Sequence, residues 1–339
     1  MPSLYLNGHQ TRVHLESRRL EVERLDDAGT ITKRLQVPIR DVDRAVFVGR
    51  VQAHMGVIDR LLRENVPVTF VSGRGEYLGT AEPPLNGNGL LRLRQYQLAG
   101  DAQFALAASE RVVHCKIRNC RRVLQRLCSS RTDPLPDVQS VCEKLRQLFN
   151  QTAAVKNLDE LRGVEGYAAK LYFSALSPFF PKDMPFTLRS RRPPADEANA
   201  LLSWTYTIVL SEIMTAVCVA GLDPCLGFLH GLGYGRPSLP LDLLEPYRAP
   251  LADLLVLHIL NHGIIKKDQF ERSEEDGGVL LGAEGRAAFF VQYEQVMERL
   301  FSKTKGGPHT TFRRAIRDDV YSLIASMQKS RHFEPFLMP

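Results

Sequence analysis

The sequence lacks the cysteine pairs that disulfide-stabilised and zinc-binding proteins require. None of its 6 cysteines belongs to a Cys-x-x-Cys pair, and their spacing fits neither a disulfide framework nor a zinc site. We therefore expect reduced cysteines in a cytoplasmic protein. The sequence starts Met-Pro-Ser-Leu-Tyr-Leu-Asn-Gly, without the basic and then apolar segments of a secretory signal peptide, so none is predicted.

The sequence also lacks an uninterrupted apolar run of membrane-spanning length. Its most apolar stretch, residues 198–229, contains the acids Glu212 and Asp223. A membrane span needs about 20 consecutive apolar residues. We therefore expect a buried helix pair in this stretch and no membrane association. We find neither an internal repeat nor a low-complexity tract.

The charge balance is only mildly one-sided. The chain has 44 Lys and Arg against 38 Asp and Glu, a formal net charge of +6. This balance favours a polyanionic partner without proving one. The length of 339 residues exceeds the about 250–300 residues at which single cores stop growing, so two domains are expected.

The first 80 residues predict a small β-rich domain. Apolar and polar residues alternate in short segments separated by turn residues such as Asn7-Gly8, which is the pattern of strands. A helix is expected at 54–65, where apolar residues recur at helical spacing. Strands are expected at 3–6, 12–15, 20–25, 30–37, 43–48 and 66–71.

A linker is predicted at residues 81–92. Two prolines and two glycines fall between Ala81 and Gly89. Beyond the linker strand patterns vanish, so residues 93–330 predict an all-helical domain and residues 331–339 a C-terminal tail. The expected fold class is therefore α+β and multidomain, with a small N-terminal β-rich domain followed by a larger all-α domain.

Residues 111–131 form a strongly basic helix, with seven basic residues and no acid. Arg111, Arg118 and Arg122 fall on one helix face, and such a stripe suits binding to backbone phosphates. A solvated face whose charges pair with acids elsewhere is the alternative, and both interpretations stay open. The same choice applies to Arg189 and Arg191, before Pro193-Pro194, where arginine clamps a phosphate or packs at a helix start.

Three segments place an acid or a histidine in a setting suited to hard-cation chemistry. Glu165 lies between glycines, and His230 follows an apolar run and precedes a glycine-rich loop. Taken alone, each also fits a surface glutamate or a structural histidine. Asp242 and Glu245 lie on one helix face, and two acids this close repel unless a cation or a base lies between them.

With these segments the chain resembles the CRISPR-associated spacer integrases, the metal-dependent endonucleases that insert new spacers during adaptation. Residues 163–173 match the family pattern G-x-E-G-x-A-A-x-x-Y-F, and residues 221–231 match G-L-D-P-x-x-G-F-L-H. Residues 191–203, 238–248 and 276–281 resemble further family elements in the same order. One departure is Cys120, since the family commonly has glutamine after the asparagine at this point.

The resemblance implies an integrase that joins the 3′-OH ends of protospacer DNA into the CRISPR repeat by transesterification. It implies Glu165, His230 and Glu245 as ligands of Mg²⁺ or Mn²⁺, with Asp242 as an additional catalytic acid. It also implies a homodimer, held through the N-terminal domain, that binds double-stranded DNA and a small ferredoxin-like adaptation protein. Basic residues near the DNA are then expected at Arg111, Arg118, Arg122, Arg189, Arg191, Arg236 and Arg248.

Three rival functions remain at this point. An integrase of a related mobile element would use the same site on a different DNA end. A catalytically silent DNA-binding scaffold would use only the basic faces. A general repair nuclease would cleave DNA without depending on a repeat sequence.

Overall fold

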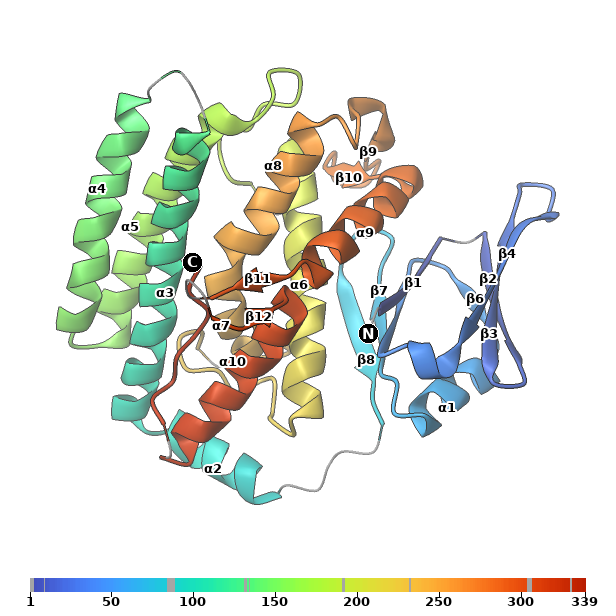
Figure 1. The fold of residues 1–339 in the computed structure, drawn as a ribbon, viewed down its shortest axis with the longest axis horizontal. Coiled ribbons are helices and arrows are strands. Elements are labelled where there is room, and N and C mark those ends of the chain that lie inside the picture. The colour runs from blue at the N-terminus through green and yellow to red at the C-terminus, as the bar shows by residue number, and fades with distance from the viewer. Residues whose placement is uncertain are drawn as a thin grey trace.

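The fold combines a small strand-rich part with a larger helical body, which confirms the predicted fold class (Figure 1). In Figure 1 the strands of the first 81 residues lie on one side of the helices. The computed structural model describes residues 3–8, 10–83, 89–130, 133, 135–190, 193–231, 233–303, 307–329 and 331–339.

Two four-stranded sheets make up the N-terminal part. One has the order β1-β5-β7-β8, with β8 antiparallel to β7 and the other pairs parallel, and the second has the order β4-β3-β2-β6. Helix α1 (Met55–Arg63) covers the core between them, and all the predicted strands are present. The strands are β1 (Ser3–Asn7), β2 (Thr11–Glu16), β3 (Arg19–Leu25), β4 (Ile31–Pro38), β5 (Arg44–Val48), β6 (Gln52–Ala53), β7 (Val68–Val71) and β8 (Tyr77–Ala81).

The first sheet packs against the helical body. All five residues of β5 are buried, as expected of a central strand covered on both faces. Val46, Val48 and Val71 belong to the same hydrophobic core as the helices. Tyr5 stacks on Phe290 of helix α9, with the ring centroids 4.2 Å apart. One face of the first sheet therefore belongs to the core of the helical body, while a separate core lies between the two sheets.

Helices form most of the remaining chain, and α3 packs along both α4 and α5. The prediction of an all-helical domain is wrong in detail, because two short antiparallel strand pairs join the helices. These strands have only two or three residues each, too few to show periodicity. The helices are α2 (Gly89–Ala99), α3 (Ala102–Ser129), α4 (Pro136–Gln151), α5 (Leu158–Leu176), α6 (Glu197–Val219), α7 (Ser238–Leu244), α8 (Leu254–Asn261), α9 (Ala283–Glu298) and α10 (Phe312–Met327). The strands are β9 (Phe270–Arg272), β10 (Val279–Leu281), β11 (Phe301–Ser302) and β12 (His309–Thr310).

The apolar stretch 198–229 is one helix followed by a loop, and not the helix pair predicted for it. Helix α6 ends before Gly221, whose φ of +83° favours glycine, and Gly221 donates to the carbonyl of Cys218. By length and composition α6 is the one described helix that could span a membrane, but 67% of its most apolar window is buried inside the protein. Its apolar surface therefore belongs to the core.

Residues 331–339, predicted as a tail, lie against the helical body. Phe333 and Phe336 are buried, and the ring of Phe336 stacks on Tyr247 at 5.0 Å. Asn119 of α3 donates to the Phe336 carbonyl at 3.0 Å and accepts from the Met338 amide at 2.8 Å. We call residues 331–339 the C-terminal strap.

Candidate active site

Glu165 lies in the middle of helix α5. The helix starts at an Asn157 cap, whose side chain accepts from the Glu160 amide at 2.9 Å, and its buried residues Leu161 and Ala168 face the core. Glu165 is four residues after Leu161 and three before Ala168, so it lies on the same side of the helix, where it forms an ion pair with the ammonium of Lys116 on the neighbouring helix α3. The carboxylate is therefore held by a cation from the adjacent helix.

His230 lies in the loop between α6 and α7, which wraps around the carboxylate of Asp242. The backbone amides of Phe228, Leu229 and His230 donate to Asp242 at 2.6, 3.0 and 2.9 Å. The loop lies so close that a Cβ on Gly227 would come within 2.7 Å of Asp242 Oδ2. Only glycine fits there.

Asp242 also fixes the ring of His230. Its Oδ1 lies 2.6 Å from His230 Nδ1. A carboxylate accepts hydrogen bonds, so Nδ1 carries the proton and Nε2 keeps its lone pair. Nε2 lies 3.9 Å from Glu245 Oε1. The ring thus presents a lone pair toward the second glutamate.

Glu245 is the first residue of the short 3₁₀ turn η4 (Glu245–Tyr247), directly after α7. Its side chain is 5% exposed, and its Oε2 lies 2.5 Å from Lys116 Nζ and 3.0 Å from Arg248 Nε. Burial raises the pKa of Glu245, but Arg248 and then Lys116 more than offset burial and lower the pKa to about 2. The buried carboxylate is therefore ionised.

The fold places Glu165 and Glu245 on the same ammonium and His230 beside Glu245, and their role as metal ligands stays a prediction. Their two carboxylates and one imidazole nitrogen are a donor set suited to Mg²⁺ or Mn²⁺. Among the residues that the structure describes, no group of three or more Asp, Glu, His or Cys side chains is arranged so that it could hold a metal ion. In this arrangement the ammonium of Lys116 pairs with both glutamates. The residues fit a cation, and a lysine supplies one.

Asp242, predicted as an additional catalytic acid, is 2% exposed. Its two oxygens accept from three backbone amides and from the His230 ring. This position makes Asp242 a residue that orients His230. A direct contact with a metal or with DNA is not part of this geometry.

The arginines expected near DNA differ in their positions. Arg248 pairs with Glu245 and lies 4.6 Å from the ring of Tyr206, and Arg189 donates to Asn199. Both are internal contacts. Arg236 is exposed on the loop before α7, and Arg191 lies outside the described residues.

The C-terminal strap contacts the predicted arginine stripe on α3. Arg111 donates to the Phe333 carbonyl at 3.2 Å, and Arg122 donates to the Pro339 carbonyl at 3.1 Å. Arg118 is exposed. Arg111 and Arg122 thus contact the backbone of the strap, and the role of the stripe on DNA stays a prediction.

Lys116 is the site residue that the sequence analysis missed. It was counted among the basic residues of α3 but not separated from them. The signal was its position, because Val112 and Cys120 lie four residues before and after it on the buried face of the helix. A lysine in an apolar stripe needs a buried partner. Here it has two.

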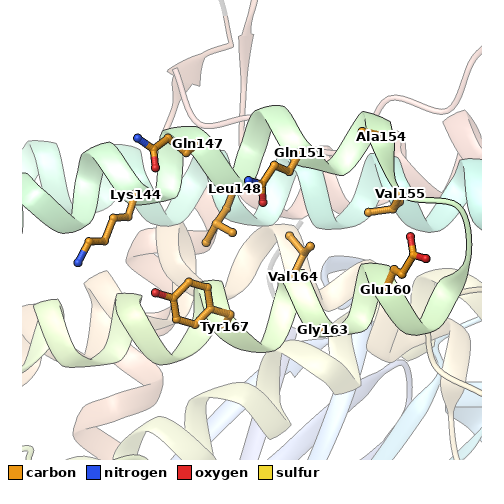
Figure 2. Close-up of a pocket in the computed structure, with 10 residues that line it drawn as sticks. All are labelled: Lys144, Gln147, Leu148, Gln151, Ala154, Val155, Glu160, Gly163, Val164 and Tyr167. Carbon is orange, nitrogen blue, oxygen red and sulfur yellow. The ribbon is translucent and has the colours of Figure 1, made fainter.

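A groove of about 720 Å³ lies between α4 and α5 (Figure 2). Figure 2 shows Gln147 and Gln151 from α4 on one side and Tyr167 and Val164 from α5 on the other. None of Glu165, His230 and Glu245 lines it. The groove is therefore separate from the carboxylate site, although both use helix α5.

Comparison with known proteins identifies relatives across most of the chain. Residues 4–295 match the family model described as CRISPR associated protein Cas1. A "CRISPR-associated endonuclease Cas1 1" from Thermodesulfovibrio yellowstonii is 34% identical, over 78% of this chain and 82% of its own length. A "CRISPR-associated endonuclease Cas1 3" from Thermus thermophilus is 35% identical, over 71% of this chain and 69% of its own length.

Solved structures show the same fold. A casposase bound to integration product superposes with a TM-score of 0.86, at 24% identity, over 100% of this chain and 94% of that one. A chain of a Cas6-RT-Cas1–Cas2 complex superposes with a TM-score of 0.82, at 26% identity, over 100% of this chain and 36% of that one.

Proposed function

The chain belongs to the CRISPR-associated protein Cas1 family, and we propose that its Glu165–His230–Glu245 site joins protospacer DNA ends into the CRISPR repeat. The reaction is a transesterification in which a DNA 3′-OH attacks a phosphodiester and a second 3′-OH leaves. With water as the nucleophile, the same site would act as an endonuclease. The family relationship makes the protein an endonuclease and integrase of CRISPR adaptation.

One observation carries the assignment of the site to these residues. Segments that are 49 or more residues apart along the chain converge on a single cation, the ammonium of Lys116. The lone pair of His230 Nε2 is directed to the same place. Glu165, Glu245 and His230 would hold a Mg²⁺ or Mn²⁺ ion, which would polarise the scissile phosphate and lower the pKa of the attacking hydroxyl.

The protein's own residues prepare this site before DNA arrives. Arg248 and Lys116 keep Glu245 ionised although it is buried. Asp242 fixes the tautomer and the orientation of His230, so that Nε2 is available as a ligand. Glu245 therefore does not have to give up a proton at neutral pH for a metal to bind.

The partners follow from the relatives and from the charge. A related chain forms a complex with Cas2, and a structural neighbour holds an integration product. We propose that this protein likewise binds double-stranded DNA and a small ferredoxin-like Cas2 partner, as a homodimer. The exposed Arg118 and Arg236 are its candidate contacts with phosphates.

A strand-transfer assay with a pre-formed protospacer, a repeat duplex and Mn²⁺ tests the site. We expect Glu165→Gln and His230→Ala to lower the rate by more than about 100-fold, the upper end of losses seen for groups that support a metal. Glu143→Gln, at an exposed glutamate of α4, is the control and should leave the rate unchanged. Wild-type rates in the two site variants would remove the assignment.

An integrase of a mobile element is the second candidate, favoured by the casposase-like fold. It would use the same residues on terminal repeats. Offering both a CRISPR repeat and a random target duplex separates the two functions. Insertion that ignores the repeat would favour the mobile-element function. Binding without any joining would favour a DNA-binding scaffold.

A further inference from the structure

We propose that Lys116 is a resident cation that holds the ligand set together without metal and that a divalent ion must displace. This inference rests on the proposed metal site and adds a competitor to it. It concerns how tightly the site binds metal, which the three ligands alone do not determine.

Lys116 lies buried between the two glutamates of the site. The side chain is 10% exposed and extends from the buried face of α3. This helix begins after Asp101, whose carboxylate accepts hydrogen bonds from the amides of Gln103 and Phe104. The ammonium pairs with Glu165 on one side and lies 2.5 Å from Glu245 Oε2 on the other. Two carboxylates that contact one ammonium favour its charged form.

Without this charge the two glutamates would face each other inside the protein. Two carboxylates close enough to contact the same ammonium repel each other strongly when that ammonium is removed, and such repulsion raises the pKa of a carboxyl group. The ammonium therefore holds the two carboxylates close together by pairing with both. A divalent ion placed between them would meet the ammonium at the same oxygens, so the two cations compete.

The charges also indicate where the displaced ammonium goes. Lys116 and Arg248 supply two positive charges against the three carboxylates of Glu165, Asp242 and Glu245. This leaves a net charge of about −1, which a divalent ion changes to about +1. A DNA phosphate then restores the balance. The flexible four-carbon stem of lysine allows the ammonium to move toward that phosphate while α3 stays in place.

Binding of Mn²⁺ alone, followed by electron paramagnetic resonance, tests the competition. We expect Lys116→Met, which keeps an unbranched side chain one atom shorter and removes its charge, to bind Mn²⁺ at least about tenfold more tightly than the wild type. Lys116→Arg keeps a competing charge and should show no such gain. Lys170→Met, at an exposed lysine of α5, is the control. Affinity in Lys116→Met equal to or weaker than in the wild type would overturn the proposal.

Thermal unfolding gives a second readout that does not depend on catalysis. Without metal, Lys116→Met should melt below the wild type, and saturating Mn²⁺ should raise its Tm by more than it raises the wild-type Tm. If Lys116→Met does not fold, Lys116→Gln provides the same comparison.

His230→Ala keeps the two proposals apart. Unchanged Mn²⁺ affinity in His230→Ala would refute the metal site itself. Loss of Mn²⁺ binding in His230→Ala, together with wild-type affinity in Lys116→Met, would refute only the role of Lys116.

Discussion

At the scale of single residues, the site depends on one aspartate that no solvent reaches. Asp242 accepts hydrogen bonds from the three backbone amides of residues 228–230 and from the ring of His230. If an NH₂ group replaces an oxygen that accepts a hydrogen bond from a backbone amide, two donors face each other and the hydrogen bond is lost. The loop, the tautomer and the direction of Nε2 therefore all depend on a carboxylate at this position.

The first prediction concerns this carboxylate. Asp242→Asn turns one acceptor into a donor that faces backbone amides, so we expect Mn²⁺ affinity to fall about 10–100-fold. The measurement is Mn²⁺ titration of the folded variant, checked by circular dichroism. Asp268→Asn, at an exposed aspartate, should bind Mn²⁺ as the wild type does. Unchanged affinity in Asp242→Asn would show that the loop positions His230 without it.

A second buried aspartate predicts a pH dependence of stability. Burial raises the pKa of Asp319 to about 7, although Tyr247 and the Phe336 amide donate to it and lower the pKa. The folded protein thus keeps a proton that the unfolded chain loses near pH 4. The contribution to stability is full below about pH 4 and is lost as the pH rises toward 7, by at most about 1.4 kcal/mol per pH unit.

Asp319→Asn should remove this pH dependence, because its oxygen still accepts both hydrogen bonds and carries no charge. We expect the variant to gain in Tm relative to the wild type as the pH is raised from 5 to 8. Asp318→Asn, at the exposed neighbour, should follow the wild-type curve. Parallel curves for wild type and Asp319→Asn would place the pKa of Asp319 in its ordinary range.

At the scale of elements, the C-terminal strap connects the surface of α3 to the turn that carries Glu245. Asn119 donates to the carbonyls of Pro246 and Phe336, at 2.8 and 3.0 Å. Tyr247 stacks on Phe336 and donates to Asp319. The strap therefore packs against η4, the turn that contains Glu245.

Phe336→Ala should loosen this turn. Removing a fully buried phenylalanine costs about 3–5 kcal/mol, and the loss should appear as a lower denaturant midpoint. Because η4 carries Glu245, Mn²⁺ affinity should fall as well. Glu334→Ala, at an exposed strap residue, should change neither quantity. A lower stability with unchanged Mn²⁺ affinity would separate the strap from the site.

The sequence predicted elements more reliably than their contacts. Alternation between Ser3 and Val48 located the strands, most of which bury at least one face, although β4 is exposed over residues 31–36. The strap has no periodicity, and its partner Asn119 lies more than 200 residues away. The Glu165–His230–Glu245 set came from family motifs. Their convergence depends on the packing of α3, α5 and η4, which no local pattern encodes.

Lys116 shows the same limit of prediction from sequence for a single residue. Its place on the apolar face of α3 was readable from the sequence. The identity of its partners was not, because Glu165 and Glu245 reach it from two other elements. A buried charged side chain predicts that a partner exists, and only the folded structure identifies that partner.

At the scale of the whole molecule, a buried charge cluster joins the two parts of the chain. Glu212 of α6 pairs with Arg44 of β5 at 2.8 Å and with Arg313 of α10 at 3.0 Å. Burial raises the pKa of Glu212, but Arg44 and Arg313 more than offset it and lower the pKa. The acid that interrupts the most apolar helix therefore has a specific position between two arginines.

Glu212→Gln should destabilise the protein by about 3–5 kcal/mol, because the buried guanidinium of Arg44 loses its counter-charge, whereas Arg313 keeps Glu294 and Glu298. Chemical denaturation measures the loss. Arg74 and Glu275 also bridge the two parts, at 2.7 Å but on the surface. Glu275→Gln should therefore have little effect. A small loss in Glu212→Gln would mean that water or other acids already serve the arginines.

The shared core has a consequence for the connection between the two parts. Val46, Val48 and Val71 are buried with the helices, Tyr5 stacks on Phe290, and Arg286 donates to the Gly73 carbonyl at 3.0 Å. Cutting the chain between residues 83 and 89 would therefore nick the protein without dividing it. Fragments produced separately on either side of that cut should complement each other when mixed, and neither should fold fully alone.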